Sequence, residues 1–105
     1  MIQITEQVRS GWCVVEIRGR ADAETADELE RALRAAVAQH PKVAADFAAV
    51  DYVSSAGLRA VLQAGRAAQE RHAAFTVCQL RGPVKKVFEV SGMHHVLRIE
   101  EALPC

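Results

Sequence analysis

Residues 43–65 read VAADFAAVDYVSSAGLRAVLQAG, and this stretch joins an apolar extended run to a run with helical periodicity. Its first part, residues 43–47, is short and almost continuously apolar, which is typical of a strand covered on both faces in a parallel sheet. In its second part, Leu58 begins an apolar repeat at i, i+3, i+4 and i+7, which predicts an amphipathic helix ending near Arg71. A strand followed by a helix indicates an α/β fold.

Ser54 and Ser55 lie where this strand gives way to the helix. The first amide groups of a helix have no partners inside it, so a hydroxyl at this place can cap the helix. A phosphate there would meet free N–H donors and the positive end of the helix dipole. A serine at this position can therefore carry a charge switch while the domain stays folded. The plain alternative is a helix cap and nothing more, and composition alone favours that alternative.

Strand patterns and helix patterns also follow one another in the rest of the chain. Period-two patterns around the turn residues Ser10 and Gly11 predict an antiparallel hairpin. A helix with Asp22 as its N-cap follows, and a later helix begins at Pro83 and ends before Gly92. The expected strands cover residues 2–8, 12–18, 43–47, 75–80 and 96–99, and the first helix covers 23–40.

The resulting order, ββαβαβαβ, predicts parallel neighbours joined by right-handed crossovers. We expect an α/β fold in which helices pack on a mixed, mostly parallel sheet, with residues 1–105 forming one domain. Residues 100–103 could start a last helix, but Pro104 would cut it short.

The composition excludes several classes of function. Thirteen basic residues balance thirteen acidic ones, so no net field attracts nucleic acid or an anionic membrane. No apolar run could span a bilayer, and residues 1–20 do not resemble a signal peptide. We therefore expect a soluble cytoplasmic protein. The three cysteines, Cys13, Cys78 and Cys105, form no CxxC pair, and a disulfide framework is not expected.

No catalytic, metal or cofactor site is expected from the motifs. A hydrolase elbow reads Gly-x-Ser-x-Gly, but Val53 stands where Ser55 would need the first glycine. The same loop has no lysine for a phosphate-binding motif. His94 and His95 are adjacent, which is a poor arrangement for a metal pair. The chain is therefore expected to be a binding protein and not an enzyme, with no cofactor.

Three aspartates, Asp22, Asp46 and Asp51, lead toward one edge of the expected sheet. They could be caps and turn formers, or they could form an acidic rim near Ser55. The pattern favours capping for Asp22 and leaves both alternatives open for Asp46.

Residues 46–59 resemble the signature of STAS domains, most closely that of bacterial anti-sigma-factor antagonists. Residues 19–22 resemble the turn into the first helix of this family, and residues 91–93 resemble its segment after the third helix. The resemblance implies a small α/β domain and a partner-switching role. It implies that an anti-sigma factor with serine kinase activity binds the unphosphorylated antagonist and phosphorylates it. A serine/threonine phosphatase then reverses the modification.

Alignment on Gly57 and Leu58 makes Ser55 the implied phosphorylation site, with Ser54 as the alternative. Many family members have an aspartate where this chain has Ser54, and a second serine where it has Ala56. The partner-binding residues implied are Asp22, Asp46, Ser54, Ser55, Ala56, Gly57 and Arg59. STAS domains also occur as unphosphorylated scaffold subunits of signalling or lipid-transport complexes, which is the alternative function.

Overall fold

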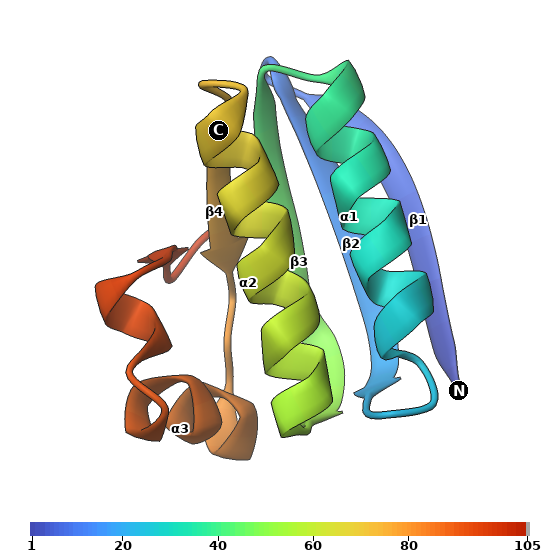
Figure 1. Cartoon of the computed structure of the whole chain (residues 1–105), viewed down its shortest axis with the longest axis vertical. Helices are drawn as coiled ribbons and strands as arrows, with labels where there is room; N and C mark the ends of the chain where they lie inside the picture. Colours follow the sequence, from blue (N-terminus) through green and yellow to red (C-terminus); the bar gives the residue numbers. More distant parts are fainter. Residues whose placement is uncertain (105) are drawn as a thin grey trace.

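A computed structural model describes residues 1–104 of the chain, and Cys105 lies outside the described residues. Two strands come first, and helices and strands alternate after them (Figure 1). The elements are β1 (Ile2–Arg9), β2 (Trp12–Ala21), α1 (Ala26–Gln39), β3 (Lys42–Val53), α2 (Ser55–Glu70), β4 (Ala74–Cys78), α3 (Gly82–Val90), the 3-10 helix η1 (Met93–His95) and β5 (Arg98–Glu100). The predicted order ββαβαβαβ is confirmed.

The five strands form one mixed sheet in the order β1-β2-β3-β4-β5. β1 and β2 are antiparallel, and the other neighbouring pairs are parallel. Ser10 and Gly11 both have positive φ in the tight turn between β1 and β2, as the predicted hairpin requires. The expectation of a mixed, mostly parallel sheet is therefore confirmed.

Helices α1 and α2 lie side by side on one face of the sheet, and α3 lies beyond the end of β4 (Figure 1). Strand residues alternate between faces, so Val15 and Phe47 point into the core under these helices, where both are fully buried. Phe88 of α3 extends this core and meets Phe47 edge to face, with ring centroids 5.6 Å apart. None of the helices within residues 1–104 is long and apolar enough to cross a membrane.

The opposite face of the sheet carries a smaller cluster of Val14, Ala44 and Cys78, all buried. Trp12 and Leu103 pack against this cluster, so the segment after β5 helps to cover it. Residues 101–104 do this without forming a helix. Cys13 and Cys78 are buried free thiols, as their places in strands predict.

Several predicted boundaries were wrong. β3 continues to Val53, well past the expected end at residue 47, because its later residues pair with β2, including Val50 with Gly19 and Val53 with Ala21. β4 ends at Cys78 because Gln79 takes a left-handed conformation with φ of 61°. β5 begins at Arg98 and not at residue 96.

The first helix begins at Ala26, three residues later than predicted. Residues before it form a turn in which the Asp22 carboxylate accepts hydrogen bonds from the backbone N–H groups of Glu24 and Thr25. The predicted cap residue therefore stabilises the turn that leads into α1, while Thr25 occupies the N-cap position.

Candidate functional site

The start of α2 lies at the edge of the sheet where β2 and β3 end. The backbone N–H of Ser54 donates a hydrogen bond of 2.9 Å to the carbonyl oxygen of Ala21, the last residue of β2. Gly57 packs against the same residue so closely that an added Cβ would lie 2.4 Å from the Ala21 carbonyl oxygen. A glycine is therefore required for this approach of α2 to β2.

The two serines have different structural roles. Ser54 is the N-cap of α2, with extended backbone, and its Oγ accepts a hydrogen bond of 3.4 Å from the Gly57 N–H. Ser55 is the first residue of the helix, and its side chain is exposed. Among residues 1–104, no side chain or backbone group hydrogen-bonds to the Ser55 hydroxyl. Of the two hydroxyls, that of Ser55 is free and accessible to a visiting protein.

Charged and aromatic side chains lie at the same edge of the sheet as this serine. Arg20 stands opposite Tyr52 in the parallel ladder, and its guanidinium carbon lies 4.2 Å from the centre of the Tyr52 ring. Its Nε is 3.6 Å from the Asp22 carboxylate. We call the exposed or half-exposed residues Arg20, Asp22, Tyr52, Ser55 and Arg59 the serine face.

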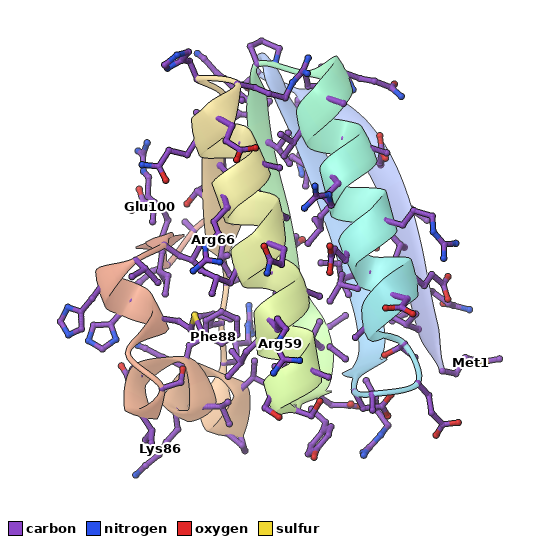
Figure 2. All side chains as sticks on the ribbon, in the orientation of Figure 1. Met1, Arg59, Arg66, Lys86, Phe88 and Glu100 are labelled. Carbon is purple, nitrogen blue, oxygen red and sulfur yellow. The ribbon has the colours of Figure 1, made fainter. Side chains whose placement is uncertain are left out.

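Arg59 follows Ser55 by four residues and therefore lies one helical turn further on the same side of α2. Figure 2 shows its side chain extending outward from the half of α2 that includes the start of the helix. No carboxylate within residues 1–104 forms an ion pair with Arg59. An unpaired cation is thus available one turn from the Ser55 hydroxyl.

The sequence did not indicate that Arg20 and Tyr52 belong to this surface. The resemblance marks residues 19–22 as a turn, and the expected strand ends at residue 47, well before Tyr52. The relevant signal is the length of β3, because its extension to Val53 brings Tyr52 opposite Arg20.

The Asp22 carboxyl is held in its charged form. Desolvation raises its pKa, but hydrogen bonds from the Glu24 backbone and from the Thr25 hydroxyl and backbone outweigh this effect and leave the pKa below the ordinary 3.8. Asp22 follows Ala21 directly and is therefore next to the start of α2. It combines a turn-forming role with a place on the serine face.

Asp46 lies elsewhere. It is 5% exposed, and it shares the side of β3 that carries Ala44, which is the face opposite α1 and α2. Its Oδ1 accepts hydrogen bonds from the Ala48 N–H at 3.0 Å and from the Gln79 side-chain amide at 2.9 Å. The structure does not bring Asp46 to the serine face. Of the two alternatives that the sequence leaves open for Asp46, its contacts support the turn-forming role and not a place in an acidic rim near Ser55.

A small depression adjoins the serine face. It has a volume of about 150 Å³ and lies between the end of β3 and α3. Its apolar lining comes mainly from Val53, Pro83, Val84 and Val87, and Tyr52 contributes from the serine face. The depression is large enough for a single apolar side chain of a partner. Ala56, the remaining predicted contact residue, is half-buried at the first turn of α2.

The arrangement suits a serine that is modified by another protein. The Ser55 hydroxyl has no base beside it among the described residues, so it is not an activated nucleophile. His94 and His95 lie on η1, with ring centroids 4.0 Å apart, and belong to a different part of the fold. The first N–H groups of α2 offer a favourable place for a phosphate.

This fold and this site define a class. Residues 4–99 match the family model described as "Mlab, STAS domain", and the chain belongs to the STAS domain family. BtrV of Bordetella bronchiseptica, named as an anti-sigma factor antagonist, is 32% identical over 92 residues, which cover 87% of this chain and 79% of BtrV.

Solved structures agree with this assignment. The crystal structure of an anti-sigma factor antagonist from Mycobacterium paratuberculosis has a TM-score of 0.83 at 28% identity, covering 98% of this chain and 88% of that one. The Bacillus cell fate determinant SpoIIAA in its phosphorylated form has a TM-score of 0.68 at 18% identity, covering 94% and 90% of the two chains. This last likeness concerns the fold alone.

Proposed function

We propose that this protein is an anti-sigma factor antagonist that works by partner switching. It binds an anti-sigma factor with serine kinase activity while Ser55 is unphosphorylated, and it releases that factor once Ser55 carries a phosphate. A serine/threonine phosphatase resets the protein. The observation that carries the proposal is the exposed, unpartnered Ser55 hydroxyl at the first position of α2. The names of the relatives BtrV and the mycobacterial protein support it.

The fold should tolerate the phosphate. The N–H groups at the start of α2 have no intrahelical acceptors, and the helix dipole favours negative charge there by about 0.3–1 kcal/mol. Arg59, one turn away, adds a cation at the spacing of a stabilising pair. The phosphorylated protein should therefore be about as stable as the unmodified one.

The interface should not tolerate the phosphate. A partner that covers the serine face meets a neutral hydroxyl, the half-exposed ring of Tyr52 and the apolar depression beside it. Phosphorylation adds about −1.5 to −2 charge to the middle of this surface. Desolvating or repelling that charge costs several kcal/mol, which corresponds to about 100-fold or more in affinity.

The acceptor residue can be determined directly. We would incubate the protein with ATP and the anti-sigma factor kinase that copurifies with it from native cells, and then measure its intact mass. One phosphate should be added to the wild type and to Ser54→Ala, and none to Ser55→Ala. Labelling that survives in Ser55→Ala but disappears in Ser54→Ala would move the site to the capping serine.

A scaffold function is the second candidate. The family description names Mlab, and a sulfate transporter family protein from Wolinella succinogenes shares the fold with a TM-score of 0.77 at 16% identity. This chain also has Ser54 where many anti-sigma-factor antagonists have an aspartate. In the scaffold case the protein would copurify with a stable assembly, and its mass would not change with ATP.

A further inference from the structure

Glu6, Cys13 and His40 meet at the opposite end of the sheet from the serine face. Glu6 pairs with Val15 in the antiparallel ladder, so it is a diagonal neighbour of Cys13 on the same side of the sheet. Cys13 stands opposite Val43 in the parallel ladder, and His40 caps α1 just before β3 begins. Three parts of the chain thus bring a carboxylate, a thiol and an imidazole together.

The separations among these groups fit a metal ion. One ligand atom from each residue lies within 4.8 Å of the other two. Cys13 Sγ is 3.6 Å from Glu6 Oε1. A tetrahedral zinc ion with bonds of about 2.3 Å to sulfur and about 2.1 Å to oxygen would hold those two atoms about 3.6 Å apart. Glu6 is exposed and His40 is half-buried, so small side-chain rotations can close the remaining separations.

We propose that Glu6, Cys13 and His40 form a Zn²⁺ site, with water as the fourth ligand. Sulfur, nitrogen and oxygen donors are the ligands that zinc takes in proteins, and three protein ligands plus water is a common set. The buried Cys13 fixes one ligand on the core side, while the exposed Glu6 leaves a route for the ion and the water.

Binding of Zn²⁺ exchanges a proton for the metal ion and needs no oxidant or reductant. The Sγ–H bond of Cys13 breaks, its proton passes to solvent, and a bond forms between the thiolate and Zn²⁺. Without metal, burial and the Glu6 carboxylate raise the pKa of the Cys13 thiol to about 11, so the thiol is protonated and donates to Glu6. The metal replaces that proton between the same two side chains.

The test is titration of the full chain, freed of metal by a chelator, with Zn²⁺ alone in a buffer without added thiols. We expect saturable binding of one ion per chain and a rise in Tm with Zn²⁺ concentration. Replacement of Zn²⁺ by Co²⁺ should give thiolate-to-metal charge-transfer absorption. Absence of saturable binding would overturn the proposal.

Matched variants identify the ligands. Glu6→Gln and His40→Gln should each weaken Zn²⁺ binding by more than the roughly 10- to 100-fold that loss of an outer-shell partner costs. Cys13→Ser should remove the charge-transfer band. If Cys13→Ser does not fold, Glu6→Gln and His40→Gln still test whether these residues bind the ion. His94→Gln, on η1 in a different part of the fold, is the control and should bind like the wild type. Undiminished binding in Glu6→Gln and His40→Gln would also overturn the site.

Discussion

The backbone N–H of Ser54 donates a hydrogen bond of 2.9 Å to the carbonyl oxygen of Ala21. This bond joins the start of α2 to the end of β2, so Ser55 is held on two packed elements rather than on a flexible loop. The same contact places Ser55 near Asp22 and Arg20, which lie on either side of Ala21 in the chain. The position of Ser55 therefore depends on how closely α2 approaches β2.

Gly57→Ala should disturb that approach. The new methyl group would lie 2.4 Å from the Ala21 carbonyl oxygen, a backbone atom that cannot rotate away. We expect a loss of about 1–3 kcal/mol in the free energy of unfolding, the usual effect of overpacking, and weaker partner binding.

Gly65→Ala in the same helix is the matched control. Its methyl group would meet side chains and no backbone: it would lie 2.6 Å from the end of the Leu97 side chain, which can move, and in ordinary contact with the Phe75 ring. Alanine also gains about 1 kcal/mol over glycine in helix propensity. Denaturant unfolding of both variants checks the pair. Equal effects at the two positions would contradict the tight contact between Gly57 and Ala21.

The two serines should differ in their effect on stability. Ser54→Ala removes the side chain that caps α2 and should cost about 1 kcal/mol. Ser55→Ala removes an exposed hydroxyl without a partner and should change the free energy of unfolding by less than about 0.5 kcal/mol. Urea denaturation compares the two variants, and a larger loss for Ser55→Ala would show that the capping assignment is reversed.

Asp46 should matter for stability and not for partner binding. Asp46→Ala leaves the Ala48 N–H and the Gln79 amide without their acceptor and should cost about 1–3 kcal/mol. Asp46→Asn keeps a carbonyl oxygen in that place and should lose less. Under conditions where Asp46→Asn is folded, its affinity for the anti-sigma factor should equal that of the wild type. A large loss of affinity in this variant would instead support the acidic rim near Ser55.

The pKa of Asp22 should lie below 3.8 and should depend on Thr25. The folded value is depressed, so the stability that Asp22 contributes is complete above pH 3.8 and is lost as the pH falls through the folded pKa. Thr25→Val removes a hydroxyl that lies 3.3 Å from the Asp22 carboxylate and should raise this pKa. An NMR titration of the Asp22 carboxyl group checks both statements. An identical pKa in the variant would contradict the role of the hydroxyl.

The architecture could be predicted because its signals are local. Period-two alternation around Ser10 and Gly11, and the apolar repeat that begins at Leu58, define elements without reference to the rest of the fold. The boundaries that were wrong depend on distant partners. The last residues of β3 are strand because β2 lies beside them, and nothing in their own pattern indicates this pairing.

The functional site likewise has features that the sequence predicts and features that only the folded structure shows. The position of Ser55 at the start of a helix follows from the sequence around it, and the resemblance to STAS domains adds the implied modification. The stacking of Arg20 on Tyr52 and the burial of Asp46 depend on sheet register and on which side of a strand faces the helices. The three residues proposed to bind zinc are separated along the chain and have no motif spacing, so only the folded structure brings them together.

The central claim is that a phosphate on Ser55 changes binding and leaves the fold intact. The most direct measurement is the affinity of the native anti-sigma factor for the protein before and after phosphorylation on Ser55, by calorimetric titration, with Tm recorded for both forms. We expect affinity to fall by about 100-fold or more while Tm stays nearly constant. Equal affinity for the two forms would contradict the account, and so would a loss of binding that merely follows unfolding.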